Sequence, residues 1–392
     1  MLLAFILFLF AGILAGVVTG LIPGIHINLV GVFLISMSIF AKINPVLSST
    51  FIISMAITHT FLDFVPSIFL GCPDTDTELS ILPGHELLKS GKAYEGILLT
   101  AYGSFAAILI LLVISFPSII LIKKSYSIIK ELIPFILIFI SIVLIYLQKN
   151  KLQAFFVFVI TGILGFLVLN TQTNQSLLPL LTGLFGASSL IISIKNKTKI
   201  PKQEITKPKI KLFKPLLGAT IAAPFCSFLP GLGSGQAAII GNTISKSNQK
   251  DFLILLGATN TLVMGFSFLS LYTIQKTRTG AALAIKEILL NFTPKILIVL
   301  LIIILISGTI SFFLTKKLAK IFSQNFHKIN YNKISIATLI ILIILNLLIS
   351  GPIGFLILTI STLTGIYCIQ TGSKRTNMMG CLLIPTIILY LF

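Results

Sequence analysis

Two short Pro-Gly segments are the clearest chemical signals in this sequence, because each interrupts an apolar run. Residues 228–236 are Phe-Leu-Pro-Gly-Leu-Gly-Ser-Gly-Gln, and residues 21–28 are Leu-Ile-Pro-Gly-Ile-His-Ile-Asn. Proline removes a backbone donor, and glycine lets another group approach the backbone closely. In hydrocarbon, open backbone is tolerated only where it is packed in protein or lines a wet cavity. Each segment is therefore either a packing corner, such as a simple kink, or a binding site.

Polar triplets interrupt the next apolar run in each case. Thr58-His59-Thr60 lies inside the run 46–71, and Thr259-Asn260-Thr261 lies inside the run 251–273, at an offset of 201 residues. Helix N-termini at the Pro-Gly segments would present unpaired N–H groups and a positive dipole end, which attract an anion. Hydroxyl and amide groups can bind carboxylate oxygens without burying a charge. The alternative for the threonines is a hydrogen bond back to their own helix.

Together these segments predict a site for a small organic anion, most naturally a carboxylate. The predicted substrate-binding residues are Pro23, Gly24, His26, Asn28, Thr58, His59, Thr60, Pro230, Gly231, Gly233, Ser234, Gly235, Gln236, Thr259, Asn260 and Thr261. Asp63 is an ionisable group within a span, which makes it the candidate for coupling to Na⁺ or H⁺. We expect no catalytic residue, no metal and no other cofactor.

The composition defines the elements that position these residues. The chain is 56% hydrophobic and 10% charged, whereas ordinary soluble domains carry about 25% charge. Apolar runs of about 20 residues, the length that crosses a bilayer as helix, recur from end to end. The sequence therefore predicts an all-α, multi-pass membrane protein, which we expect in the cell (plasma) membrane.

The net charge of +19 does not indicate nucleic-acid binding. The lysines lie in short loops between apolar runs, where positive charge sets the orientation of a membrane protein. Anionic membrane lipid is the expected partner of these loops.

A basic segment divides the chain near its middle. Residues 195–214 carry eight lysines, with Pro201 and Pro208, and are predicted to be a cytoplasmic linker. The linker separates a first membrane repeat, 1–194, from a second, 215–392. Each repeat is predicted to hold a re-entrant Pro-Gly hairpin, a span interrupted by a Thr-x-Thr triplet, and four further spans. Those further spans are expected at 95–122, 131–147, 151–169 and 176–194, and at 294–315, 333–349, 352–370 and 376–392.

Five crossings in the first half would place the second half upside down relative to the first. With re-entrant hairpins and the basic segment inside, 21 of the 29 Lys and Arg residues would face the cytoplasm, in agreement with the positive-inside rule. The alternative, in which the hairpins span the membrane fully, fits the rule nearly as well. Inverted repeats with broken helices at matched positions are typical of secondary transporters.

Motifs for other functions are missing from the sequence. It has no Gly-x-x-x-x-Gly-Lys-Ser/Thr loop for ATP and no nucleophile elbow or His-Glu-x-x-His. A gradient-driven carrier is therefore favoured over an enzyme. The alternative is a membrane scaffold without transport, or an intramembrane enzyme that uses His26, His59 and Asp63.

Several motifs resemble the large membrane subunit (TctA type) of the tripartite tricarboxylate transporter family, in its archaeal branch. The motifs are Gly20-Leu-Ile-Pro-Gly24, Gly71-Cys-Pro-Asp74 through Leu82-Pro-Gly-His85, Gly91-Lys-Ala-Tyr-Glu95 and the segment 228–236. The resemblance implies uptake of tricarboxylates such as citrate, with a small membrane subunit and an extracytoplasmic binding protein as partners. The first Pro-Gly segment departs from the bacterial pattern at residues 25–28, where smaller residues are expected.

Overall fold

The structure is a computed structural model, and all regular structure in the part that it describes is helical. The described residues are 2–22, 44–71, 77–146, 148, 150–171, 173, 176–195, 201–228, 233–277, 279–289, 291–325, 331–373 and 375–391. The predicted all-α membrane class is confirmed. The helices of the first half are α1 (Leu2–Leu21), α4 (Pro45–Leu62), α5 (Phe64–Leu70), η1 (Glu78–Ser80), α6 (Ile81–Lys89), α7 (Ala93–Tyr146), α8 (Lys151–Leu169), α9 (Leu177–Leu181), η2 (Thr182–Ala187) and α10 (Ser188–Lys195).

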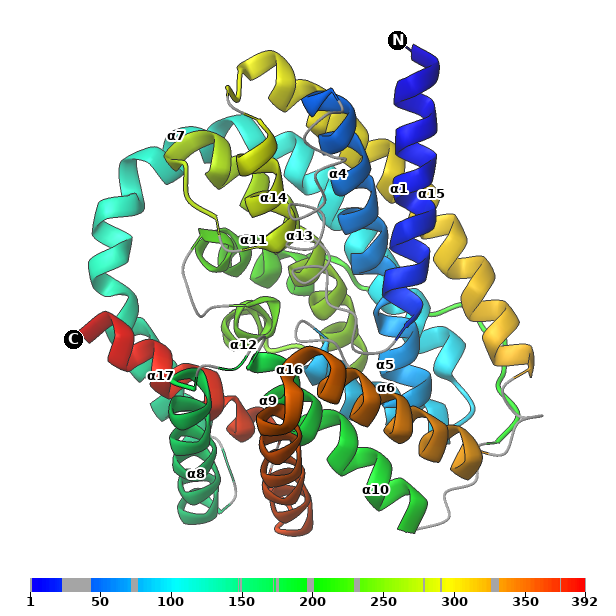
Figure 1. The fold of residues 1–392 in the computed structure, drawn as a ribbon, viewed down its shortest axis with the longest axis vertical. Coiled ribbons are helices and arrows are strands. Elements are labelled where there is room, and N and C mark those ends of the chain that lie inside the picture. The colour runs from blue at the N-terminus through cyan, green and yellow to red at the C-terminus, as the bar shows by residue number, and fades with distance from the viewer. Residues whose placement is uncertain are drawn as a thin grey trace.

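The second half, after the basic segment, has a similar order of long and short helices. They are α11 (Phe213–Phe228), α12 (Ser234–Ser245), α13 (Gln249–Ile274), α14 (Gly280–Ile288), α15 (Pro294–Asn325), α16 (Tyr331–Gln370), η4 (Arg375–Met379) and α17 (Gly380–Leu391). Figure 1 shows α11 and α12 nearly end-on in the middle of the molecule, surrounded by the longer helices.

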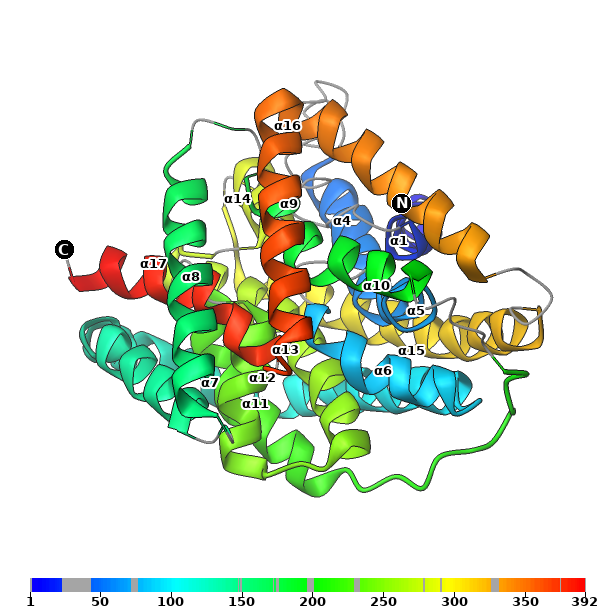
Figure 2. The same cartoon turned by 90° about the horizontal axis from the view of Figure 1, so that it is seen from below.

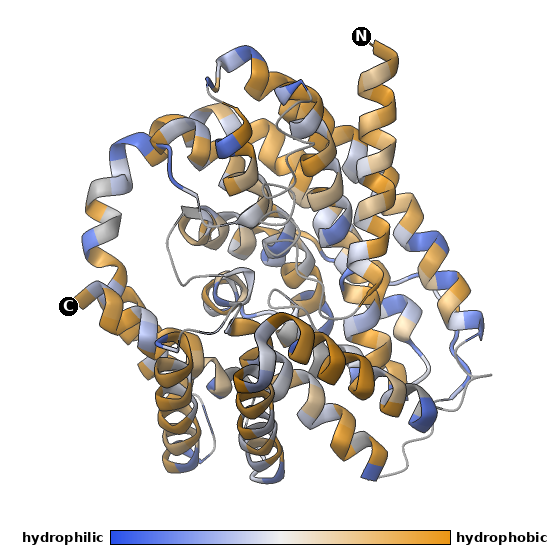
Figure 3. Cartoon of the chain, in the orientation of Figure 1, coloured by the Kyte–Doolittle hydropathy of each residue, from blue (hydrophilic) through white to orange (hydrophobic). Residues whose placement is uncertain are grey.

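Seven helices among the described residues are long and apolar enough to cross a membrane, so the chain is a multi-pass membrane protein. They are Leu2–Leu21, Pro45–Leu70, Ala93–Tyr126, Lys151–Leu169, Gln249–Ile274, Pro294–Asn325 and Ser335–Gln370. Figure 3 shows α1 apolar along its whole length. Three predicted spans, 131–147, 176–194 and 376–392, are shorter apolar helices instead.

Two pairs of predicted spans follow each other without an intervening loop. The spans 95–122 and 131–147 both belong to α7, which contains Pro117 and Pro134 and bends around one side of the molecule (Figure 1). The spans 333–349 and 352–370 both belong to α16, which is kinked at Gly351. Proline is tolerated inside membrane helices because neighbouring groups compensate for the lost hydrogen bond. The first pair is therefore one bent helix, whereas the second pair is two helical arms that meet at Gly351, between the two predicted spans.

The span containing α4 and the helix α13 form the centre of the fold. In each, 94% of the most apolar stretch is buried, against 28% for α1. Within the first half α1 packs on α4, and within the second half α11 packs on α13. Between the halves, α7 packs on α13 and α15 packs on α4. Each half thus packs one long helix on the central helix of the other half, as two related repeats would. The inverted orientation of the halves stays a prediction.

Glycines allow the central helices to approach at backbone contact. A Cβ at Gly12 or Gly16 of α1 would lie 2.0 Å from Ser54 Oγ or 2.5 Å from Met55 O of α4. A Cβ at Gly257 of α13 would lie 2.1 Å from Thr100 O of α7. Small residues at such contacts let membrane helices pack closely.

The basic segment is anchored to the first half through Gln203, which is buried. The amide oxygen of Gln203 accepts from Ala93 N at 2.9 Å, and its nitrogen donates to Leu88 O at 3.0 Å. The backbone N–H of Glu204 donates to Gly91 O at 2.7 Å. This part of the predicted linker therefore packs against the corner between α6 and α7.

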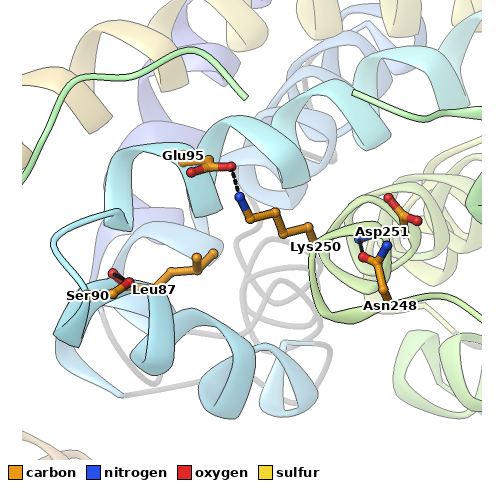
Figure 4. A network of polar contacts seen from close by, with 6 residues as sticks. All are labelled: Leu87, Ser90, Glu95, Asn248, Lys250 and Asp251. Atoms are coloured by element: carbon orange, nitrogen blue, oxygen red, sulfur yellow. Dashed lines mark hydrogen bonds and ion pairs between the residues drawn. The ribbon is translucent and has the colours of Figure 1, made fainter. Parts of the chain in front are cut away.

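An ion pair ties the same corner to the start of α13. Lys250 Nζ donates to Glu95 Oε1 at 2.5 Å (Figure 4), with the Glu95 side chain only 7% exposed. One residue earlier, the amide of Gln249 donates to the carboxylate of Glu86. Glu95 belongs to the Gly91–Glu95 motif, and here it joins the two halves of the chain.

The close contact between α7 and α13 can be tested with Gly257→Ala. The added Cβ would meet backbone atoms that cannot rotate away, so we expect a loss of about 1 to 3 kcal/mol of stability, as is typical of overpacking. Thermal unfolding in detergent measures it as a lower Tm. Gly96→Ala is the control, because its Cβ would meet only the ends of flexible side chains, the nearest being Leu87 Cδ1 at 3.1 Å. Equal Tm values for the two variants would contradict the contact.

Candidate functional site: a polar seam between α4 and α13

Both central helices begin at asparagine caps that fix their positions. Asn44 Oδ1 accepts from Val46 N at 2.9 Å at the start of α4, where Pro45 is the first helical residue. Asn248 Oδ1 accepts from Asp251 N at 2.9 Å at the start of α13. Asparagine at these positions satisfies a backbone donor that the helix leaves unpaired. Asp63 lies at the junction between α4 and α5.

The three residues of the first polar triplet contact three different helices. Thr58 Oγ1 accepts from Ser311 Oγ of α15 at 2.8 Å. The ring Nδ1 of His59 lies 3.2 Å from Thr19 Oγ1 of α1, and the hydroxyl of Thr60 faces α13. Successive residues on an α-helix point about 100° apart. The triplet therefore joins α4 to three neighbours and does not gather at one point.

Four side chains form what we call the polar seam: Thr60 and Asp63 of the first half, and Asn260 and Thr261 of the second. The hydroxyls of Thr60 and Thr261, 201 residues apart, lie 3.2 Å from each other. Asn260 Nδ2 donates to Asp63 Oδ2 at 2.7 Å. All four residues are at most 3% exposed. The seam therefore brings a carboxylate, an amide and two hydroxyls together in the buried centre.

The helix backbone is continuous at both triplets, so the polar residues interrupt the apolar sequence but not the helix. Helix α13 runs unbroken from Gln249 to Ile274, and α4 continues to Leu62. Thr259 Oγ1 lies 3.0 Å from Leu255 O and from Leu256 O of its own helix, as the alternative interpretation predicted for threonine. The Thr-x-Thr interruption of each span is therefore a run of polar side chains within a helix.

The second Pro-Gly segment joins two short helices that pack side by side. Helix α11 has 16 residues and α12 has 12, or about 24 Å and 18 Å of helix, and each is shorter than the hydrocarbon core of about 30 Å. A Cβ at Gly218 would lie 2.3 Å from Gly241 O, so the two arms are in backbone contact. These lengths agree with a hairpin that enters the membrane and returns.

Helix α12 begins with Ser234, Gly235 and Gln236, which are all buried. Gln236 Oε1 accepts from Gly233 N at 2.6 Å, which fixes the orientation of the side-chain amide. Its Nε2 group is buried and has no hydrogen-bond partner among the described residues. An unpaired buried donor is costly, and here it lies at the positive end of a helix that packs on α13.

Six predicted site residues lie outside the described residues. They are Pro23, Gly24, His26, Asn28, Pro230 and Gly231. Their roles stay predictions. Of the others, the structure brings together Thr60, Asp63, Asn260 and Thr261 in the seam, and Gly233, Ser234, Gly235 and Gln236 at the start of α12.

Two partners of the triplet were missed by the sequence reasoning. Thr19 of α1 contacts His59, and Ser311 of α15 contacts Thr58. Both are polar residues inside strongly apolar runs, and this is a signal that could have identified them. Thr19 is also next to Gly20, on the helix that packs on α4.

Comparisons with known proteins agree with the motifs. A model of the family described as "Tripartite tricarboxylate transporter TctA family" matches residues 6–380. The chain belongs to this family. An uncharacterized protein of the archaeon Methanocaldococcus jannaschii is 32% identical over 400 residues, which cover 98% of this chain and 99% of that protein. No solved structure matches the chain. The predicted family is confirmed, and membership makes the chain a membrane subunit of the tricarboxylate transporter type.

The bond between Asp63 and Asn260 can be tested with single and double substitutions. We expect Asp63→Ala to destabilise the protein by about 1 to 3 kcal/mol, because the buried amide of Asn260 loses its acceptor. Asp63→Asn should cost less, since an amide oxygen can replace the carboxylate oxygen. Denaturant unfolding of the double-mutant cycle with Asn260→Ala measures the coupling. Additive effects of the two alanine substitutions would contradict the bond.

Proposed function

We propose that the protein is a gradient-driven secondary transporter of a small organic anion, a di- or tricarboxylate, which works by alternating access. Family membership supports the substrate class, because the family is one of tricarboxylate transporters. The organisation around two buried polar helices in an apolar chain supports a site deep within the membrane. The proposed location is the cell membrane.

The observation that carries the proposal is the polar seam together with the start of α12. Thr60, Asn260 and Thr261 of the seam, together with Gln236, supply neutral donors and acceptors from helices of both halves. Neutral hydroxyls and amides, with the N-terminal end of a helix, can bind an anion without the desolvation cost of a buried cationic side chain. The oriented, unpartnered amide nitrogen of Gln236 is a donor ready for a carboxylate oxygen.

We further propose that residues 1–194 and 215–392 are inverted repeats related by a pseudo-two-fold axis through the seam. In a two-fold interface, equivalent residues meet one another on the axis, as Thr60 and Thr261 do. A second matched feature supports the axis: Ser67 bonds Thr77, and Ser267 bonds Thr279, each at 2.7 Å. Alternating access would then be a rocking of one half against the other around the seam.

Asp63 is the proposed coupling group. It is the carboxylate of the seam, and protonation or binding of Na⁺ there would change its bond with Asn260. A carboxylate that alternates between two charge states inside a membrane can link a gradient to movement of the helices that hold it. The family name suggests that a small membrane subunit and an extracytoplasmic binding protein complete the system.

The intramembrane enzyme that the sequence left open gains no support from the seam. His59 contacts α1 through Thr19, whereas Asp63 contacts α13 through Asn260. These contacts direct the two side chains toward different neighbouring helices. We therefore retain transport as the proposed function.

Ligand-dependent thermal unfolding of the purified protein tests the site. We expect one di- or tricarboxylate in a panel, tested with Na⁺ and at low pH, to raise Tm, since a ligand at about 100 times its Kd stabilises by roughly 2.7 kcal/mol. Each variant is compared with its own ligand-free Tm. Asn260→Ala and Thr60→Ala, which each remove a polar group of the seam, should lose the shift.

Thr50→Ala is the matched control, because Thr50 is a buried threonine of α4 that bonds back to Val46 O at 2.7 Å. It should keep the full ligand-induced shift. Full shifts in Asn260→Ala and Thr60→Ala would contradict the proposed site.

A further inference from the structure

Helix α16 consists of two helical arms that meet at a kink at Gly351. Gly351 has φ 67° and ψ −164°, a backbone conformation that only glycine adopts readily. Pro352 follows and has no backbone N–H to donate to the preceding turn. The last carbonyls of the first arm therefore lose helical donors, and they form the negative end of that arm.

Two side-chain oxygens in this last turn are buried without a partner. Asn346 Oδ1 and Ser350 Oγ have no hydrogen bond within the part of the chain that the structure describes, and the two residues are 0% and 6% exposed. Asn346 Nδ2 donates to Leu342 O at 2.8 Å, which identifies the other amide atom as the unpaired oxygen. Residues four apart lie on one helix face. Two unpaired buried polar groups one helical turn apart are costly unless a ligand satisfies them.

The second arm lies close over this face. A Cβ at Gly354 would meet Ser350 Cβ at 2.2 Å and Asn346 O at 3.5 Å. A Cβ at Gly351, in contrast, would meet nothing within 4 Å. The kink therefore combines a tight contact between its arms with open space beside the backbone break.

We propose that the kink of α16 is a binding site for Na⁺. Its ligands would be Asn346 Oδ1, Ser350 Oγ and backbone carbonyls of the last turn before Gly351. Hard cations prefer oxygen ligands, and the C-terminal ends of broken membrane helices hold Na⁺ in transporters. The ligands are neutral, which favours a monovalent ion over a divalent one. No group of three or more His, Cys, Asp or Glu among the described residues could hold a metal ion.

The position of the kink suggests what the ion would control. Helix α16 packs on α10 and on the π-helix η2 (Figure 2), and a Cβ at Gly183 of η2 would lie 2.5 Å from Ser361 Cβ on the second arm. An ion at the kink would fix the angle between the two arms. As a coupling device the site rests on the proposed transport function, but as a binding site it does not.

Thermal unfolding of the purified full chain against NaCl tests the site without any transport substrate. Choline chloride keeps the ionic strength constant, and KCl is measured in parallel. We expect a saturable rise in Tm with Na⁺ that K⁺ does not reproduce at the same concentration. Asn346→Leu and Ser350→Ala should each weaken the apparent Na⁺ affinity at least tenfold.

Thr359→Ala is the matched control, since it removes an exposed hydroxyl of the second arm that bonds to Phe355 O. It should keep the Na⁺ response of the unmodified protein. A protein with no Na⁺-specific rise in Tm would overturn the proposal, as would a Na⁺ response that survives both Asn346→Leu and Ser350→Ala. If that surviving response disappears in Asp63→Asn, the ion binds at the polar seam instead. None of these results depends on whether the chain transports a carboxylate.

Discussion

Polar side chains in the centre of a membrane protein must find their partners within the protein, because hydrocarbon offers none. In this chain the requirement is met between the two most buried helices. Thr60 meets Thr261, and Asp63 meets Asn260, so each half of the chain satisfies groups of the other. The glycine contacts of α1 with α4 and of α7 with α13 hold a neighbouring helix at backbone contact against each of the two seam helices. The rest of the fold surrounds this pairing.

The seam is symmetric in its hydroxyls and asymmetric in its charge. At the offset of 201 residues, Thr60 corresponds to Thr261, whereas His59 corresponds to Asn260 and Asp63 to Met264. A pair of repeats would thus supply a common scaffold, and the differences between them would leave one carboxylate at the centre. A single ionisable group near the axis suits a carrier in which one coupling event accompanies each cycle. The proposed Na⁺ site lies on a different helix, α16, and would give an ion a second place at which to influence the transport cycle.

The sequence predicted the class and the two central helices, because long apolar runs and their polar interruptions are strong signals. The family was predicted from its short motifs. The predicted spans 46–71 and 251–273 agree closely with the observed Pro45–Leu70 and Gln249–Ile274. It did not predict which way each triplet residue points, since the rotation of a buried helix depends on all its neighbours. The continuous helix α7 was also missed, because Lys123 and Lys124 were interpreted as a loop. The anchoring of the basic segment by Gln203 was not predicted either, because a single glutamine in a polar segment belongs to no periodic pattern. The orientation of the two halves remains a prediction.

Uptake of labelled citrate and succinate into proteoliposomes, driven by an inward Na⁺ or proton gradient, tests whether the polar seam is a transport site. We expect accumulation that stops when an ionophore collapses the gradient. Asn260→Ala should abolish this accumulation, and Thr50→Ala, on the same central bundle, should preserve it. Equal uptake by the two variants would contradict the assignment of the polar seam as the transport site.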